Sequence, residues 1–349
     1  VPVQDGPVPD DADTTAYADP AANSRALKSL SHLLGADITG ICEVPDYAWF
    51  SHDTTGEPME IKHKYAVVML IDQEFDTMEG ASGDDWISGT QSMRAYLRGA
   101  EIAGIMADTV RQLGFAARSQ TNVDSDVLHI PLVLLAGLGE LSRIGELVLN
   151  PFVGPRLKTV VLTTDMPLKP DKPIDFGLQY FCDNCTKCAR ECPCDAISWG
   201  PKVVFNGYEM WKPDAERCAR YRLTNARGSA CGRCMKTCPL NKVVTADGPL
   251  LQRAASWCGI HAPALKPALV PLAVKLDDQL GNGGLNPAKK WWFDMEVIDG
   301  VCVEPIKGVN QRGLNVEHHL DWKKQKMAYY PASAMPVPND LAAQPTDRK

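Results

Sequence analysis

A set of closely spaced cysteines constrains this chain more than any other feature. Residues 182–193 read C-x2-C-x2-C-x3-C-P, and residues 231–239 read C-x2-C-x3-C-P. The first spacing is typical of bacterial modules that hold two [4Fe-4S] clusters, in which the fourth cysteine of a run binds the other cluster. Short gaps let one loop present three thiolates to an iron–sulfur cube, and a distant cysteine completes the set. The pattern therefore predicts two clusters.

The crossed pattern also predicts which cysteines bind which cluster. The first cluster is expected to bind Cys182, Cys185, Cys188 and Cys238, and the second Cys192, Cys218, Cys231 and Cys234. Disulfides would not require this clustering, and zinc sites favour isolated C-x2-C pairs, usually with histidine. Cys194 adds a further thiol to the first loop and is not expected to be a ligand.

Composition limits the class of protein. The 349 residues are 45% hydrophobic, which suits two domains or one domain with an inserted module. The net charge of −7, from 36 basic and 43 acidic residues, argues against a nucleic-acid partner and a polybasic membrane anchor. No apolar run reaches about 18 residues, so no transmembrane helix is predicted.

The cellular compartment is left open by the sequence. No signal peptide is visible, and the first residue is Val1 rather than Met, which fits removal of a leader or trimming. Reduced cysteines suit cluster assembly in the cytoplasm, which is the location we favour. Export followed by association with a membrane is the alternative, since it would leave the same mature sequence.

The remaining chain divides by its patterning. Residues 1–24 are rich in Pro, Asp and Ala and are predicted to run extended over the surface. Within residues 25–175, apolar stretches at 65–71 and 157–164 predict buried strands, and 91–113 predicts a long helix. This alternation indicates an α/β or α+β core.

The second half of the chain begins with the cysteines. Residues 176–248 form the expected two-cluster module. Residues 249–330 are expected to complete the core and a substrate pocket, with helices over 249–280 that prolines interrupt, and 331–349 to form a tail. Two clusters imply electron delivery to another group, yet no flavin or nicotinamide motif such as GxGxxG after a strand is visible.

Several blocks resemble the reductive dehalogenases, which are corrinoid-dependent iron–sulfur enzymes. The blocks are GLGELSRIG at 137–145, NPFVGPR at 150–156, TDMPL at 164–168, FC at 181–182 and KKWWF at 289–293. Their order and spacing extend the resemblance over roughly residues 25–330. The resemblance implies an α+β fold, in which a nitroreductase-like corrinoid-binding core joins a ferredoxin-like two-[4Fe-4S] module.

The resemblance also implies where a cobalamin would lie. Its tail and amide arms are expected against two glycine-containing turns, at Gly137, Gly139, Glu140, Ser142, Arg143, Asn150, Gly154 and Arg156. Like the family, the chain lacks the D-x-H-x-x-G corrinoid signature. A base-off cofactor without a histidine ligand from the protein is therefore expected.

A tyrosine proton donor beside a basic residue is the family's catalytic arrangement. The matching residues are Tyr96 and Lys158, with Arg156 as the alternative base, while Asn122 matches a pocket asparagine and Arg222 is a further candidate on the substrate side. A phenol with a pKa near 10 is a weak acid unless a nearby cation favours the phenolate. Lys158 would supply that cation and would attract the departing halide.

The resemblance implies reductive dehalogenation, in which an organohalide, two electrons and a proton give the dehalogenated product and halide. Cobalt performs the difficult step. The lysine favours halogenated aromatics over chlorinated ethenes, by analogy within the family. An external donor is expected because no reductase domain is visible; a ferredoxin, a flavodoxin or a membrane partner would fit.

Two other functions compete. An enzyme like epoxyqueuosine reductase would share the corrinoid and clusters and would use an acidic proton donor, here Asp124 or Asp126. Its tRNA substrate fits the net charge of −7 poorly. A non-catalytic electron-transfer protein is the other alternative.

Overall fold

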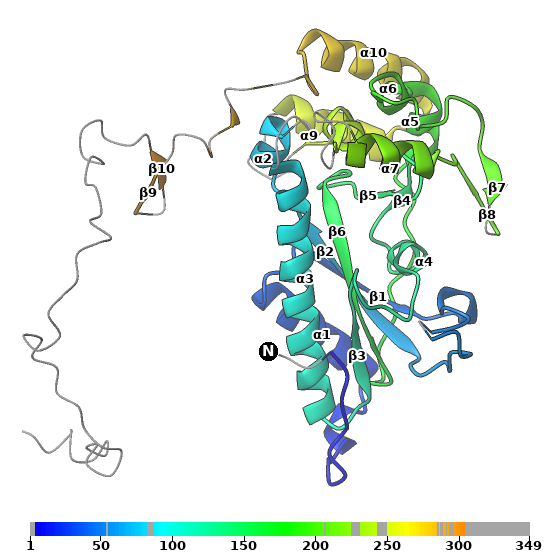
Figure 1. Ribbon diagram of the computed structural model, residues 1–349, viewed down its shortest axis with the longest axis vertical. Coiled ribbons are helices and arrows are strands. Elements are labelled where there is room, and N and C mark those ends of the chain that lie inside the picture. Colours follow the sequence, from blue (N-terminus) through cyan, green and yellow to red (C-terminus); the bar gives the residue numbers. More distant parts are fainter. Residues whose placement is uncertain are drawn as a thin grey trace, which may run out of the picture. The chain divides into compact units, whose positions relative to one another are not determined.

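A computed structural model (Figure 1) describes much of the chain. The described residues are 4–53, 55–81, 87–205, 207–224, 231–242, 250–284, 286, 289, 290, 292, 296–299 and 301–303. The chain divides into two compact units, residues 1–293 and 294–349. In the second unit, β9 (Glu296–Ile298) and β10 (Val301–Val303) form an antiparallel hairpin. The predicted tail at 331–349 lies outside the described residues.

A four-stranded antiparallel sheet forms the centre of the first unit. The strands, in spatial order, are β1 (Ile38–Glu43), β2 (Tyr65–Asp72), β6 (Leu157–Thr164) and β3 (Ala117–Gln120). The two central strands pair along their full length, from Tyr65 opposite Thr164 to Asp72 opposite Leu157. Both coincide with predicted strands, because their runs of β-branched and apolar residues suit burial on two faces.

One face of the sheet packs on α1 (Pro20–Leu33) and on α3 (Ile87–Gln112), as Figure 1 shows. Alternate strand residues such as Met69, Val160 and Leu162 meet the apolar stripe of α3, as the two-residue period of a strand requires. The predicted helix is confirmed, although it begins four residues earlier than residue 91.

The opposite face packs on α4 (His129–Leu135) and on Trp49, which follows the short η2 (Asp46–Ala48). Val68, Leu70 and Val161 point to this side. Both faces are therefore covered, and the architecture is mixed α+β, as predicted.

The N-terminal segment differs from its prediction. Residues 15–17 form η1 (Thr15–Tyr17), and α1 begins at Pro20, inside the segment expected to be extended. Asp19 caps this helix by accepting a hydrogen bond from the Ala21 N–H at 2.8 Å. A capping aspartate followed by proline at the first helical position is a strong start signal, and it outweighs the polar composition.

Short elements carry the cysteines at the end of the sheet where β6 begins. They are β4 (Glu140–Leu141), β5 (Val148–Leu149), α5 (Leu178–Cys185), α6 (Lys187–Arg190), β7 (Val203–Phe205), β8 (Tyr208–Met210), α7 (Ala215–Thr224) and α8 (Arg233–Lys236). A small core of Leu149, Leu178, Cys182 and Trp211 holds them together.

The remaining helices are α2 (Phe75–Gly80), α9 (Leu250–His261), η3 (Pro263–Leu265) and α10 (Lys266–Gln279). The prolines interrupt the predicted helical stretch only in part, since Pro271 lies inside α10. Among the described helices, none is both long and apolar enough to cross a bilayer.

Candidate active site

The first predicted cysteine set lines one cavity. Cys182 and Cys185 come from α5, Cys188 from α6, and Cys238 follows α8. The cavity, which opens to solvent, comprises about 290 Å³ of space not filled by atoms. Ser142, Arg143, Ile144, Leu149, Phe181, Thr186 and Pro239 complete its wall. Segments more than fifty residues apart in the chain therefore present four sulfurs to one centre.

Burial dominates the electrostatics of this cavity. Burial, together with the charges of neighbouring thiolates, raises the pKa of the Cys182 and Cys188 thiols to about 12. Burial also raises the pKa of Cys185 and Cys238. Four thiolates here would need strong cationic compensation, which an iron–sulfur cluster supplies. The donor set therefore fits a cluster.

The second predicted cysteine set also converges. Burial raises the pKa of Cys234, and the thiolate charges of Cys231, Cys218 and Cys192 add to the effect. Cys218, which stands outside the regular cysteine spacing, lies on α7, and its thiolate charge raises the pKa of Cys231 as well. The thiolate charge of Cys188 in the first set also raises the pKa of Cys234, so Cys234 lies within electrostatic reach of both sets.

Cys194 lies beside the second set, with its Sγ 3.8 Å from that of Cys192. Throughout the described part of the chain, no three His, Cys, Asp or Glu side chains form a site for a single metal ion. In a four-iron cube, each thiolate binds a separate iron.

Tyr96 and Lys158 meet on the α3 face of the sheet. Gly99 of α3 packs against Val160 of β6. Tyr96 lies three residues before Gly99, and Lys158 lies two residues before Val160, so both lie closer to the end of the sheet where β6 begins. Three helical residues span about 4.5 Å and two strand residues about 6.6 Å, so the two side chains come level. The Lys158 Nζ is 5.0 Å from the centre of the Tyr96 ring.

Arg222 completes this group from α7. Burial raises the pKa of Tyr96, and the charge of Arg222 acts against that rise. Burial lowers the pKa of Lys158, and Arg222 lowers it further, whereas the Cys234 thiolate raises it. The group therefore combines a protonated phenol with two cations, next to the second cysteine set.

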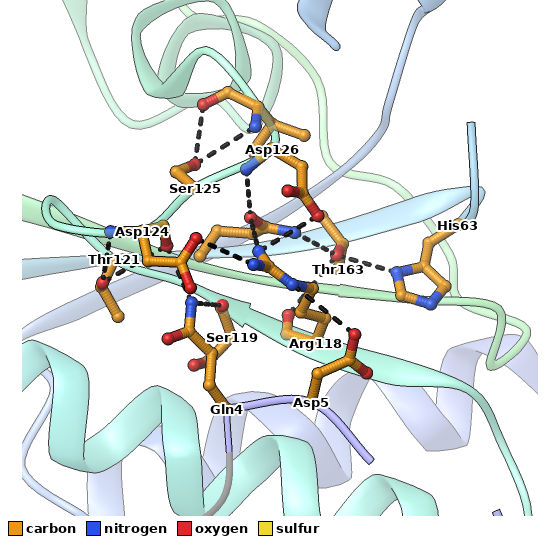
Figure 2. A network of polar contacts seen from close by, with 12 residues as sticks. Gln4, Asp5, His63, Arg118, Ser119, Thr121, Asp124, Ser125, Asp126 and Thr163 are labelled. Atoms are coloured by element: carbon orange, nitrogen blue, oxygen red, sulfur yellow. Dashed lines mark hydrogen bonds and ion pairs between the residues drawn. The ribbon is translucent and has the colours of Figure 1, made fainter. Parts of the chain in front are cut away.

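The other predicted polar residues lie around Arg118, in the network of Figure 2. Arg118 pairs with Asp124 at 2.9 Å and with Asp126 at 3.1 Å. These ion pairs occupy both candidates for the single acidic proton donor of an epoxyqueuosine reductase-like mechanism. Asn122, on the same loop, is exposed, and the described contacts do not join it to Tyr96 or Lys158.

Several known proteins are similar to this chain. Residues 181–242 match the 4Fe-4S dicluster domain family. A tetrachloroethene reductive dehalogenase of Desulfitobacterium hafniense is 30% identical over 341 residues, covering 79% of this chain and 59% of that enzyme. A tetrachloroethene reductive dehalogenase of Sulfurospirillum multivorans is 32% identical over 219 residues, covering 61% and 38%.

Among solved structures, the catabolic reductive dehalogenase NpRdhA in complex with 3-bromo-4-hydroxybenzoic acid matches with a TM-score of 0.77 and 51% identity, over 97% of this chain and 48% of that one. The chain belongs to the reductive dehalogenase family. A further family structure, linked to B12-dependent dehalogenation, is also 51% identical over 97% of the chain. The chain spans about half the length of these relatives.

The predicted corrinoid-binding residues all have partners within this reductive dehalogenase chain. At Gly154, φ is +60° and a Cβ would collide with the Leu240 carbonyl, so only glycine lets the turn approach the cluster module. Gly137 has φ +71° and approaches the Lys172 carbonyl in the same way, and Gly139 lies tightly against Leu149. These contacts explain the glycines without a ligand.

Glu140, Ser142 and Asn150 organise the backbone. Glu140 accepts hydrogen bonds from the N–H groups of Phe176 at 2.8 Å and Leu178 at 3.2 Å, so it caps the helix that carries the first cysteines. The Ser142 hydroxyl donates to the Leu147 carbonyl, and the Asn150 amide donates to the Leu138 carbonyl, both at 2.8 Å.

The two arginines of these turns join the core to the cluster module. Arg143 donates to the Cys182 carbonyl at 2.7 Å and to that of Ser198 at 2.9 Å. Arg156 pairs with Asp72 at 2.8 Å and donates to the Lys242 carbonyl at 2.8 Å. Its guanidinium is therefore engaged by Asp72 and Lys242, whereas Lys158 is the basic residue that lies beside Tyr96. Contact of the predicted turn residues with a corrinoid stays a prediction.

Other features near Tyr96 suit a large amide-bearing macrocycle. Gln73 directly follows β2 and donates to Ser92, one turn before Tyr96, while its own Oε1 is buried with no partner in the described chain. Corrinoid amide arms could donate to this oxygen. Met93 and Leu97 expose apolar surface on the same stretch of α3. The residues present therefore fit the family's cofactor.

Sequence reasoning missed the residues that fix this geometry. Asp277 of α10 is 4% exposed and pairs with Lys187 at 2.5 Å, which joins α10 to the helix of Cys188. Asp72 orients Arg156, and Arg233 lies next to Cys234 in the chain. A buried acid or arginine carries no spacing signal, so only its position in the fold distinguishes it from a solvated charge.

Proposed function

We propose that this chain catalyses reductive dehalogenation, with halogenated aromatics favoured as substrates. An organohalide, two electrons and one proton give the dehalogenated product and a halide ion. The observation that carries the proposal is the Lys158 ammonium 5.0 Å above the Tyr96 ring, next to the second cysteine set. This arrangement holds a proton and a cation at the point where electrons would arrive.

The eight cysteines are proposed to bind the two clusters as predicted. Cys182, Cys185, Cys188 and Cys238 would hold the first, and Cys192, Cys218, Cys231 and Cys234 the second. Cys234 lies near Cys188 and near Lys158. Electrons from an external ferredoxin, flavodoxin or membrane partner would therefore pass from the first cluster to the second and then to the active site.

A base-off cobalamin is proposed to bind to the nitroreductase-like core beside Tyr96. Gln73 and the turns at 137–143 and 150–156 would hold its amide arms and tail. When bound, it supplies a low-valent cobalt that breaks the carbon–halogen bond. The described histidines His63 and His129 are hydrogen-bonded to threonines, which supports binding without an imidazole ligand from the protein.

Tyr96 would donate the proton that the cleaved carbon needs. Its raised pKa keeps the phenol protonated at neutral pH, and Lys158 and Arg222 would stabilise the phenolate left behind. The same cations would attract the halide. They would also suit an anionic aromatic such as the 3-bromo-4-hydroxybenzoate bound to the related enzyme, whereas Asn122 would serve only at the pocket entrance.

The test combines cofactor content with turnover. Anaerobically reconstituted protein should contain about eight irons and one cobalt per chain and release bromide from brominated 4-hydroxybenzoates under a strong reductant. Tyr96→Phe should lower turnover at least about 100-fold, the scale of general acid catalysis, with iron and cobalt unchanged. Tyr47→Phe, at an exposed position, is the matched control.

Two outcomes would contradict the proposal. Full turnover in Tyr96→Phe would exclude this phenol as the proton donor. Normal iron content with no cobalt and no bromide release would instead indicate a pure electron-transfer protein.

A further inference from the structure

The Arg233 side chain is partly buried, with 29% of its surface exposed. Its Nε is buried and finds no hydrogen-bond acceptor among the described residues, as is also true of the uncharged indole nitrogens of Trp49 and Trp211. Its Nη2 contacts Glu191 at 3.3 Å. A buried N–H of a charged group without an acceptor is costly, so its acceptor is expected outside the polypeptide.

The position of Arg233 indicates what that acceptor is. Arg233 begins α8, between Cys231 and Cys234 in the sequence. Burial raises the pKa of the Cys231 thiol, and the backbone N–H and the charge of Arg233 both act against the rise. The guanidinium therefore lies within electrostatic reach of the second cysteine set, where the inorganic sulfides of a cluster would be the nearest new acceptors.

Arg143 provides the contrast at the first cysteine set. Its Nε donates to the Cys182 carbonyl, its Nη1 donates to the carbonyls of Ser198 and Gly200, and its Nη2 lies 3.7 Å from Asp183. The guanidinium also lies 4.8 Å from the Trp211 ring. Arg143 thus brings charge to the first set, but its Nε and Nη1 donors are already hydrogen-bonded to backbone carbonyls.

We propose that Arg233 donates its Nε–H to a sulfur of the second cluster and raises that cluster's reduction potential. Hydrogen bonds to sulfur favour the reduced cluster, which carries more negative charge, and are among the levers that set cluster potentials. Glu191 fixes the guanidinium in place. The inference rests on the two-cluster assignment, and it gives the second cluster a greater affinity for the electron than it would otherwise have.

The test is a potentiometric titration of the full chain, followed by electron paramagnetic resonance. In Arg233→Gln and Arg233→Lys, the midpoint potential of the second cluster should fall, while that of the first stays unchanged. A tenfold loss in the equilibrium constant for its reduction corresponds to about 59 mV for one electron. An exchangeable proton coupled to the reduced second cluster should disappear in both variants.

Arg190→Gln is the matched control, because Arg190 also contacts Glu191, at 3.3 Å, from an exposed position. Unchanged potentials and proton coupling in the Arg233 variants would overturn the proposal, as would an equal shift in Arg190→Gln. Loss of the second cluster even in Arg233→Lys would also overturn it and assign Arg233 to the scaffold. None of these readouts needs turnover, so failed dehalogenation would count against the proposed function alone.

Discussion

The two cysteine sets hold equivalent ligands in different surroundings. The first set lines a cavity whose wall comes from the turn at 142–144, α5 and α6. The second set includes Cys218 from a separate helix and lies within electrostatic reach of Lys158, Arg222 and Arg233. One set is thus embedded in structural contacts, while the other borders the groups that can move a proton. The proposed function therefore assigns electron relay to the first set and contact with the reacting groups to the second.

Substitution of one cysteine from each set should give the largest effect. Cys188→Ala and Cys234→Ala should each lower the iron content from about eight to about four per chain and abolish turnover, because one cluster is lost. Iron and sulfide analysis, with resonance spectra of the surviving cluster, would show which one remains. Cys194→Ala should keep about eight irons, and a loss of iron there would replace one of the predicted ligands.

The next effect tests the support of the first set. Asp277→Ala should lower the free energy of unfolding by about 3–5 kcal/mol, because it leaves the ammonium of Lys187 buried without its closest partner. Asp278→Ala is the matched control, since Asp278 contacts the same ammonium at 3.0 Å but is 36% exposed. Its cost should stay below about 1 kcal/mol. Anaerobic denaturant titration measures both, and equal losses would show that burial does not decide the difference.

The smallest effect concerns the surroundings of the second set. Arg222 lowers the pKa of Lys158 by charge repulsion and that of Tyr96 by favouring the phenolate. Arg222→Gln should raise both values, so Lys158 stays charged and Tyr96 stays protonated to higher pH. The alkaline limb of the pH–rate profile should therefore move upward. Arg220→Gln, on the same helix but at a residue paired with Glu216, should leave that limb in place, and a shared shift would point to net charge instead.

Much of the fold could be read from local patterns. The runs that form β2 and β6 and the stripe of α3 were visible because periodicity follows directly from strand and helix geometry. The N-terminal boundary was not, because the start signal of Asp19 and Pro20 competed with a polar composition. The sequence did not predict that Asn122 is exposed or that Asp124 and Asp126 pair with Arg118, because no local pattern encodes such contacts.

The sequence by itself determined the family, the two cysteine sets and the pairing of Tyr96 with Lys158 as a hypothesis, because spacing and motif order are local properties of the chain. Only the tertiary structure decided that Arg156 is held by Asp72 and that Arg222 lies within electrostatic reach of Lys158. It also decided that the Nε of Arg143 donates to a carbonyl while the Nε of Arg233 finds no acceptor in the described chain. The physical reason is that burial and charge pairing arise between distant segments, and identical side chains acquire different energies there.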